Sequence, residues 1–368
     1  MLMWWLIGLV AISITPGLYI RLNPQFGGPL TRSRKRALEQ SKQWNGKIFD
    51  NLHPIQMDVN LKTLPGLFRE RFFKKNAREP EVPIPVTPFD AEAFSANSDK
   101  PKFVWYGHAT LMLQINGKNL LIDPMFGPNA SPIALSGIKR FSENTLDLID
   151  DLPPIDAVLI SHDHYDHLDY KSIKKLKGKV DTYFVALGVS RHLERWGVAA
   201  GQITEFDWWQ DLDFKGIKIT FTPSQHFSGR GLSDRFKSLW GGWVFQEEKH
   251  RIYWSGDGGY GDHFKTVTEK LGPFDWAFME CGQYYDLWHQ LHLFPEESVQ
   301  AAIDAQAKMA IPVHWGGFAL AMHAWKEPVE RFVTAADQKQ LPVFTPEIGA
   351  VITMGQEPGT KRWYTNLK

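Results

Sequence analysis

The sequence predicts an α/β fold in which two β-sheets are flanked by helices. Three observations lead to this prediction. Short apolar runs recur from Lys102 onwards, stretches with helical patterning lie between the later runs, and Asn116-Gly117 separates two of the early runs, as is typical of a β-hairpin. Hairpins early in the chain and strand–helix alternation later favour two sheets with helices outside them.

Residues 1–20 are predicted to be a hydrophobic membrane anchor or an uncleaved signal. This segment has no charged side chain, and about 20 apolar residues are needed to cross a bilayer as a helix. Basic residues follow at Arg21, Arg32, Arg34, Lys35 and Arg36. By the positive-inside rule, they favour an anchor in the inner membrane with the bulk of the chain in the cytoplasm. A cleaved signal peptide, with a periplasmic product, is the alternative, although a basic n-region and an Ala-x-Ala site are missing.

Residues 21–100 are predicted to connect and wrap rather than to form a domain, because they are loop-rich and polar, with prolines at 80, 83, 85 and 88. The folded domain is predicted over residues 101–355, and residues 356–368 form a C-terminal tail. Within the domain, the expected strands are Phe103–Trp105, Leu111–Ile115, Leu120–Ile122, Ala157–Ile160, Tyr183–Ala186, Ile217–Phe221, Trp243–Phe245, Ile252–Trp254, Trp276–Met279 and Ala310–Val313. The expected helices include Tyr170–Leu176, Val189–Trp196, Phe264–Leu271 and Pro295–Ala307.

Composition narrows the class of protein. The 368 residues are 43% hydrophobic, enough for a large core. The 41 basic and 41 acidic residues cancel, so no overall charge favours nucleic acid as a partner. A single cysteine, Cys281, excludes an internal disulfide and a cysteine-rich zinc site.

The segment His162–His167 is the most informative motif, because it has the pattern His-x-His-x-Asp-His directly after an apolar run. Such loops at strand ends are where α/β folds place ligands. Imidazole and carboxylate groups suit Zn²⁺ and similar metals. His162 and His164 are expected to bind one ion, with Asp166 and His167 serving a second ion nearby.

Three further residues complete a predicted two-metal site. His226, Asp257 and His314 each follow an apolar run, so they are expected to reach the same rim of the sheets. Taken singly, each is as readily an ordinary loop residue. Together they give one ion His162, His164 and His226 and the other ion Asp166, His167 and His314, with Asp257 bridging both. Two Zn²⁺ ions are expected, with Fe²⁺ or Mn²⁺ as alternatives.

With these ligands, the chain resembles the metallo-β-lactamase superfamily over residues 100–355, which implies an αββα sandwich. Asp123 matches an early aspartate of that superfamily and is expected to orient a ligand histidine. A closer resemblance, to the N-acylphosphatidylethanolamine-hydrolysing phospholipase D family, rests on several motifs. They are Gly107-His-Ala-Thr, Ile122-Asp-Pro-Met-Phe, Pro153-Pro-Ile-Asp-Ala-Val-Leu-Ile-Ser-His, His164-Tyr-Asp-His-Leu-Asp-Tyr, Asp207-Trp-Trp, Phe221-Thr-Pro-Ser-Gln-His, Leu239-Trp-Gly, Gly256-Asp-Gly-Gly-Tyr, Gly272-Pro-Phe-Asp and His314-Trp-Gly-Gly-Phe-Ala-Leu.

The resemblance implies the same seven ligands and adds a catalytic or substrate-positioning histidine, His292, before Pro295-Glu-Glu. The expected enzyme is a metal-dependent phosphodiesterase that hydrolyses N-acylphosphatidylethanolamine or a related phospholipid to phosphatidic acid and N-acylethanolamine. In the implied mechanism a metal-bridging hydroxide attacks phosphorus. Asp257, His292 and Asp166 are the predicted catalytic residues. The expected partners are a phospholipid substrate and the membrane, with a possible homodimer and no nucleic acid.

Two features depart from the family pattern, namely the hydrophobic N-terminal segment and the loop Gln283–Leu291 near the expected substrate entrance. Two alternative functions stay open. One is another hydrolase on this fold, such as a lactonase or a different phosphodiesterase, and the other is a non-catalytic, membrane-tethered metal-binding protein.

Other polar and aromatic residues receive structural assignments. Asp163 and Asp169 are expected to be solvent-facing or helix-capping residues, and His108 is expected to pack beside the site without a chemical role. A set of aromatic residues is expected either to pack in the core or to line a groove for an acyl chain. The core is favoured for Trp208 and Trp209. The set is Trp208, Trp209, Trp240, Tyr284, Tyr285, Trp288 and Phe294.

Overall fold

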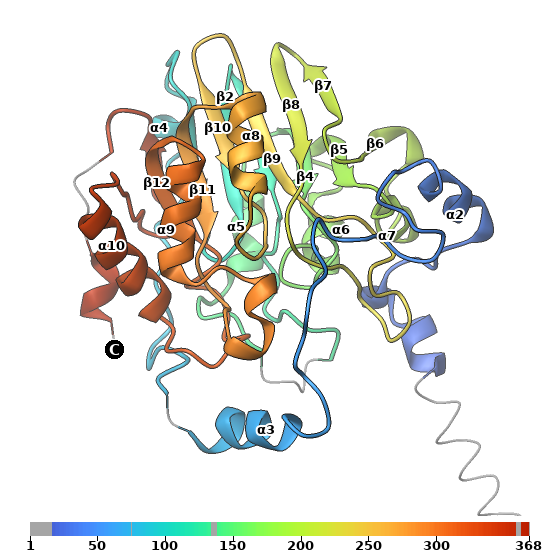
Figure 1. Ribbon diagram of the computed structural model, residues 1–368. Coiled ribbons are helices and arrows are strands. Elements are labelled where there is room, and N and C mark those ends of the chain that lie inside the picture. Colours follow the sequence, from blue (N-terminus) through green and yellow to red (C-terminus); the bar gives the residue numbers. More distant parts are fainter. Residues whose placement is uncertain (1–16, 75, 134–137, 358–361, 368) are drawn as a thin grey trace, which may run out of the picture.

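The computed structural model describes residues 17–74, 76–133, 138–357 and 362–367, and it places two β-sheets face to face (Figure 1). One sheet has seven strands in the order β13-β1-β2-β3-β4-β5-β6, and the other has six in the order β12-β11-β10-β9-β8-β7. Helices lie outside both sheets, as in an αββα sandwich. The predicted fold class is confirmed.

The seven-stranded sheet begins with antiparallel pairs and becomes parallel from β3 to β6. Asn116 and Gly117 both have positive φ angles, 49° and 66°, and they form the predicted two-residue hairpin between β2 and β3. The strands of this sheet are β1 (Lys102–Trp105), β2 (Leu111–Ile115), β3 (Lys118–Ile122), β4 (Ile155–Ile160), β5 (Val180–Ala186), β6 (Ile203–Phe206) and β13 (Val351–Thr353).

The six-stranded sheet is antiparallel from β7 to β10 and parallel from β10 to β12. Its parallel strands are apolar throughout much of their length, because helices cover one face and the other sheet covers the opposite face. The strands are β7 (Asp211–Phe214), β8 (Ile217–Thr222), β9 (Gly242–Gln246), β10 (Arg251–Trp254), β11 (Phe274–Glu280) and β12 (Ala307–Val313).

The helices form three sets. The outer side of the six-stranded sheet is covered by α8 (His263–Leu271), α9 (Pro295–Asp304) and α10 (Glu327–Lys339), with α9 packed on β11 and β12. Beside the other sheet lie α5 (Leu148–Asp151), α6 (Tyr170–Leu176) and α7 (Ser190–Arg195). The N-terminal segment contributes α2 (Arg32–Leu38), α3 (Leu64–Phe73) and α4 (Ala91–Ser95). Short 3₁₀ turns are η1 (Pro24–Phe26), η3 (Thr145–Asp147), η4 (Ala200–Gln202), η5 (Asp286–Leu291) and η6 (Trp363–Asn366).

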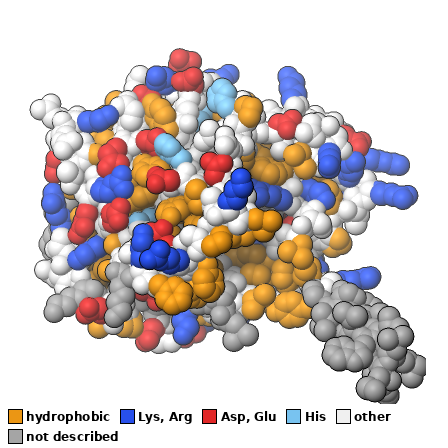
Figure 2. Space-filling view, turned by 60° about the horizontal axis from the view of Figure 1, so that its bottom comes forward, with side chains coloured by type: hydrophobic (Ala, Val, Ile, Leu, Met, Phe, Trp, Pro, Cys, Tyr) orange, Lys and Arg blue, Asp and Glu red, His pale blue; other side chains and the backbone are white. Residues whose placement is uncertain are grey.

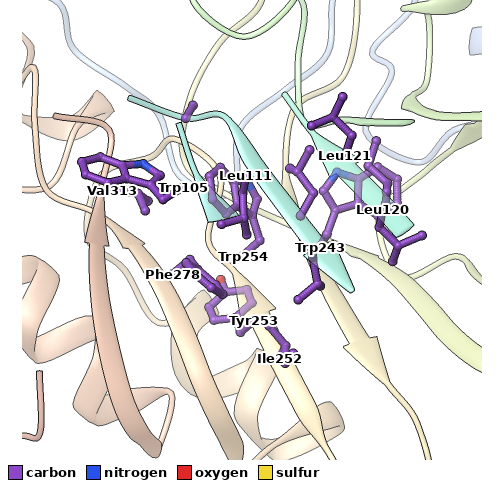
Figure 3. Close-up of a cluster of buried hydrophobic side chains, with 14 of the residues drawn as sticks. Trp105, Leu111, Leu120, Leu121, Trp243, Ile252, Tyr253, Trp254, Phe278 and Val313 are labelled. Carbon is purple, nitrogen blue, oxygen red and sulfur yellow. The ribbon is translucent and has the colours of Figure 1, made fainter. Parts of the chain in front are cut away.

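Large aromatic and aliphatic side chains fill the space between the sheets (Figure 3). Phe103 on β1 contacts Trp276 and Phe278 on β11 edge-to-face, with each pair of ring centroids 5.0 Å apart. Trp105, Trp243 and Trp254 are also buried here. This core holds the two sheets in a fixed relation, so that loops leaving different sheets meet at one rim.

The predicted membrane-anchored localisation is corrected by the structure. Within the ranges described above, there is no helix long and apolar enough to cross a bilayer. Of the predicted anchor, residues 1–16 lie outside the described residues, and residues 17–22 form a short helical segment. After it, residues 23–28 lie against α7, where the Trp196 indole donates to Pro24 O (2.7 Å) and Gly28 N donates to His192 Nδ1 (3.1 Å).

Candidate metal centre

The loops that follow strands β4, β8, β10 and β12 meet at one edge of the sandwich. They bring together all seven residues that were predicted as metal ligands: His162, His164, Asp166, His167, His226, Asp257 and His314. Six of these side chains are buried and His164 is half-buried. Their assignment as ligands stays a prediction, but their proximity is a feature of the fold.

Three histidines form a first group. His162 Nε2 lies 2.9 Å from His164 Nδ1, and His164 Nδ1 lies 3.3 Å from His226 Nε2. The first two come from the loop after β4 in one sheet and the third from the loop after β8 in the other. A ligand placed among these nitrogens would therefore contact loops that leave both sheets.

Asp166, His167 and His314 form a second group. His314 Nε2 is 3.3 Å from both His167 Nε2 and Asp166 Oδ2, and His167 Nε2 is 3.6 Å from Asp166 Oδ2. The ligand atoms of this group, together with one from His108, all lie within 4.8 Å of one another. The two groups are the ones expected from the sequence.

Asp257 lies between the two groups. Its Oδ2 atom is close to one pair of histidines and somewhat farther from another, at 3.0 Å from His167 Nε2, 3.1 Å from His314 Nε2, 3.8 Å from His226 Nε2 and 3.9 Å from His162 Nε2. One carboxylate oxygen thus faces histidines of both groups, which is the position that a bridging ligand requires.

The two groups suit metal ions. A tetrahedral ion with bonds of about 2.1 Å keeps its ligand atoms roughly 3.4 Å apart, and the distances given above within the two groups lie between 2.9 and 3.6 Å. Imidazole and carboxylate donors without cysteine are typical of hydrolytic zinc, iron or manganese centres. The donor set and its spacing therefore fit divalent metal ions, and two such ions remain a prediction.

The pKa values of the predicted ligands are shifted in different directions. Burial and the neighbouring His167 imidazole hold the pKa of His162 well below its usual range, so His162 is neutral. Burial alone would lower the pKa of His167, but Asp257 and Asp166 raise it to about 10. Burial would raise the pKa of Asp257, but His167 and His314 lower it well below its usual range. The carboxylates are therefore ionised and available to a cation.

Two further residues, Asp123 and His108, form hydrogen bonds with predicted ligands of the second group. Asp123 Oδ2 is 3.0 Å from His167 Nδ1, as the sequence led us to expect, and its other oxygen accepts from Ser161 N. His108 Nε2 is 2.8 Å from Asp166 Oδ2, so His108 orients a predicted ligand instead of only packing beside the site. Asp123, His108 and His314 have positive φ angles of 43°, 53° and 66°. Such non-glycine conformations cluster at functional sites.

The prediction that Asp163 faces solvent or caps a helix was wrong. Its carboxylate is fully buried and accepts hydrogen bonds from Gly229 N and Ser238 Oγ, both at 2.7 Å. His192 Nε2 and an Arg191 guanidinium nitrogen lie 3.1 and 3.4 Å from it. Asp163 therefore ties the loop after β4 to α7 and to the loop before β9. Asp169, by contrast, caps α6 as expected, accepting from Ser172 N.

Glu280, the last residue of β11, was not singled out from the sequence. Its side chain is fully buried beside His292, and the Nδ1 atom of His292 donates to its carboxylate in a close hydrogen bond. His292 itself lies within a 4.8 Å group with Asp257, Glu280 and His314. An acidic residue ending an apolar strand was the available signal in the sequence.

The aromatic residues divide between core and surface. Trp208 and Trp240 are buried, and the Trp208 indole donates to Trp240 O. Trp209 and Trp288 are half-buried. A cavity of about 290 Å³ is lined by Tyr284, Tyr285 and Phe294, but also by Glu70, Glu327 and Arg331. Its charged walls do not suit an acyl chain.

The fold and the ligand cluster define a class of protein. The family model described as the beta-lactamase superfamily domain matches residues 118–315. The chain belongs to this superfamily and is a metallo-hydrolase of the metallo-β-lactamase fold.

Two relatives match most of the chain. An uncharacterised protein of Mycobacterium tuberculosis is 37% identical over 319 residues, which cover 85% of each chain. The N-acyl-phosphatidylethanolamine-hydrolyzing phospholipase D 1 of Caenorhabditis elegans is 32% identical over 343 residues, covering 86% of this chain and 93% of the relative.

A solved structure agrees in fold. A metallo hydrolase from the archaeon Ignicoccus hospitalis superimposes with a TM-score of 0.54, covering 69% of this chain and 98% of its own. At 20% identity this likeness concerns the fold alone.

Proposed function

We propose that the protein is a metal-dependent phosphodiesterase of the phospholipase D type, which hydrolyses N-acylphosphatidylethanolamine or a related phospholipid. The products are phosphatidic acid and an N-acylethanolamine. The relative from Caenorhabditis elegans, which is named an N-acyl-phosphatidylethanolamine-hydrolyzing phospholipase D and matches over 93% of its length, supports the phosphodiester as the bond that is cleaved. The exposed apolar face of α3, beside the site, is the structural observation that carries the choice of a lipid substrate.

The seven clustered side chains would hold two ions, with Asp257 shared between them. Bound divalent ions supply Lewis-acid stabilisation of phosphate oxygens and activation of water. A role for His292 in the reaction is supported by its position beside two predicted ligands, because its ring packs edge-on against His226 and face to face with His314, at centroid distances of 4.9 and 5.5 Å. Its side chain is 14% exposed, so a substrate can reach it. We assign it protonation of the leaving ethanolamine oxygen.

The outer face of α3 is apolar. Leu64, Phe68 and Phe72 recur at helical spacing and are 46%, 59% and 66% exposed, and Leu61 before the helix is 88% exposed. Exposed basic residues, Lys62, Arg69 and Lys74, accompany them. Figure 2 shows hydrophobic side chains gathered on the face that carries α3, with basic side chains beside them. Apolar side chains with a basic fringe suit the interface of an anionic phospholipid surface.

Hydrogen bonds attach α3 to two loops. Glu70, on the side of the helix away from Phe68, accepts from the hydroxyl of Tyr285 (2.5 Å) in the loop that leads to His292, and Arg71 donates to Ala319 O (2.9 Å) in the loop after β12. Just before the helix, Asp58 N donates to Leu287 O (2.9 Å). A lipid surface docked on α3 would therefore lie next to the loop between Gln283 and His292.

Replacing Phe68 and Phe72 together by serine is expected to weaken binding to anionic phospholipid vesicles by about 30-fold. Each exposed phenyl ring contributes roughly 1 kcal/mol on entering the interface, and 2 kcal/mol corresponds to about that factor. Vesicle sedimentation measures the binding. Leu212→Ser is the control, because Leu212 is an exposed apolar residue on β7, far from α3 in Figure 1. Equal binding by both variants would contradict docking through α3.

Purified protein loaded with Zn²⁺ is expected to convert N-acylphosphatidylethanolamine in mixed vesicles to phosphatidic acid and N-acylethanolamine. Mass spectrometry of the lipid fraction identifies the products, and bis-p-nitrophenyl phosphate reports phosphodiester hydrolysis without a lipid. Cleavage of the water-soluble diester alone would indicate a different phosphodiesterase. Cleavage of a lactone with both diesters untouched would indicate a lactonase, and no turnover of any of them would favour a metal-binding protein.

A further inference from the structure

Glu280 is a buried carboxylate that the ligand assignment leaves without a role. It ends β11, and its side chain is 0% exposed. A buried carboxylate is costly unless hydrogen-bond donors surround it. Across the described residues, its ion-pair partners are histidines and include no lysine or arginine. The donors that stabilise it are therefore parts of the site itself.

Both carboxylate oxygens of Glu280 accept hydrogen bonds. Oε2 accepts from Gly258 N at 2.6 Å, on the residue that follows the predicted bridging ligand Asp257. Oε1 accepts from His292 Nδ1 in a close hydrogen bond and lies 3.4 Å from His314 Nδ1. A second acceptor near His314 Nδ1 is Gly282 O, at 3.5 Å.

An ionised carboxylate only accepts hydrogen bonds, so the proton of the His292–Glu280 bond belongs to Nδ1 of the imidazole. The second ring nitrogen, Nε2, then lies on the side of the ring away from Glu280. His314 has the same arrangement, with Nδ1 towards Glu280 and Nε2 towards Asp257 and Asp166, at 3.1 and 3.3 Å. One carboxylate thus sets the orientation of two neighbouring rings, which stack with an interplanar angle of 8°.

We infer that Glu280 is a positioning residue that keeps His292 protonated on Nδ1 and directs its Nε2 atom at the leaving group. This inference rests on the proposed function. In the step, the bond between phosphorus and the leaving oxygen breaks, and its electron pair stays on that oxygen. The attacking water forms the new phosphorus–oxygen bond and gives its proton to Nε2 of His292, which is unprotonated in the Nδ1–H form. The imidazolium formed in this way, stabilised by the Glu280 carboxylate, passes that proton to the leaving oxygen, which departs as an alcohol, and His292 returns to its neutral form.

A glutamine at position 280 cannot replace the carboxylate. Glu280 supplies two acceptors, one for Gly258 N–H and one for His292 Nδ1–H, whereas a glutamine amide has only one acceptor. The backbone N–H of Gly258 cannot change, but an imidazole can change its tautomer. In Glu280→Gln, the amide oxygen is therefore expected to accept from Gly258, while the amide NH₂ donates to Nδ1 of His292. The proton of the neutral ring then moves to Nε2.

The tautomer is measured first, because it does not depend on turnover. In zinc-loaded protein labelled with ¹⁵N-histidine, the His292 signals, assigned by their loss in His292→Gln, are expected to show Nδ1–H in the wild type and in Glu280→Asp. They are expected to show Nε2–H in Glu280→Gln. The matched control is Glu297→Gln, because Glu297 also pairs with a histidine, His289 (2.7 Å), but at a more exposed position. An unchanged His292 tautomer in Glu280→Gln would overturn the inference.

Turnover of two diesters tests the consequence. A p-nitrophenolate leaves without protonation, whereas an alkoxide needs an acid. Glu280→Gln is therefore expected to lower kcat by about 100-fold for an alkyl phosphodiester and to change the bis-p-nitrophenyl phosphate rate little. Glu280→Asp restores part of the alkyl rate, and zinc content stays that of the wild type. Equal losses for both diesters, or loss of zinc, would make Glu280 a ligand or structural residue. If the wild type cleaves neither diester, the proposed function fails, and the tautomer alone decides the role of Glu280.

Discussion

Asp257→Asn is expected to lower the rate of phosphodiester hydrolysis by a factor on the order of 10³, which corresponds to an increase of about 4 kcal/mol in the activation barrier. The reason is the position of Asp257 Oδ2, which faces His167 and His314 in one group at 3.0 and 3.1 Å and the first group at 3.8 Å or more. Asparagine removes the negative charge that two cations would share, and its NH₂ group repels them. Metal analysis and the rate with bis-p-nitrophenyl phosphate measure the effect.

The control for this variant is Asp169→Asn, which makes the same chemical change in a buried residue outside the two ligand groups. Asp169 caps α6 through its bond from Ser172 N, and asparagine caps helices as well as aspartate does. We therefore expect Asp169→Asn to keep its activity and metal content. Wild-type activity in Asp257→Asn, with an unchanged circular dichroism spectrum, would exclude a two-metal mechanism with Asp257 as the bridge.

Asp163→Ala is expected to lower the free energy of unfolding by about 3–5 kcal/mol, because it removes the nearer of the two carboxylates that lie within 4 Å of a buried guanidinium, that of Arg191. The Arg191 guanidinium is 1% exposed and keeps one neighbouring carboxylate, that of Asp234 at 3.7 Å. Gly229 N and Ser238 Oγ also lose their acceptor. Urea denaturation followed by tryptophan fluorescence measures the change.

Asp181→Ala is the matched surface variant. Its carboxylate is 72% exposed and lies 3.6 Å from Lys215 Nζ, so its removal is expected to change the free energy of unfolding by less than about 1 kcal/mol. Similar urea midpoints for the two variants would show that Asp163 does not hold the loop after β4 in place. A normal midpoint for Asp181→Ala with a strongly lowered midpoint for Asp163→Ala is the expected pattern.

Much of the fold could be predicted because the central strands are buried on both faces and appear as apolar runs. The predicted strand Leu111–Ile115 has the observed bounds of β2, and the predicted Ile217–Phe221 lacks only Thr222 of β8. The edge strands β6, β7 and β13 were not predicted. In β7, Asp211–Phe214, three of the four residues are exposed, so the apolar pattern that marks a buried strand is missing.

One predicted helix end was wrong. The helix that begins at Pro295 was expected to continue to Ala307, but α9 ends at Asp304. Gln306 has a positive φ angle of 50°, which turns the chain, and Ala307 begins β12. An alanine-containing run does not reveal where such a reversal falls. The helix start, in contrast, was predictable from proline at the first position and from Glu297, which accepts from Phe294 N.

The part of the candidate site that could be predicted consists of the residues that come soon after a strand in the sequence. His226 and His314 lie at strand ends, and the order of strands in a sheet brings such ends together. His108, Asp163 and Glu280 could not be given their roles in this way. Each acts through partners that are distant in the sequence, as when His108 bonds Asp166, 58 residues later. Only the three-dimensional structure places those partners.

The distribution of the ligand cluster over two sheets links cation binding to folding. The segment His162–His167 follows β4 in the seven-stranded sheet, whereas His226, Asp257 and His314 follow strands of the six-stranded sheet. An unfolded chain offers only the short segment as a weak local chelator, and the complete set exists only when the sheets are packed. By mass action, any cation that prefers the complete set stabilises the folded chain, and its removal favours separation of the two sheets.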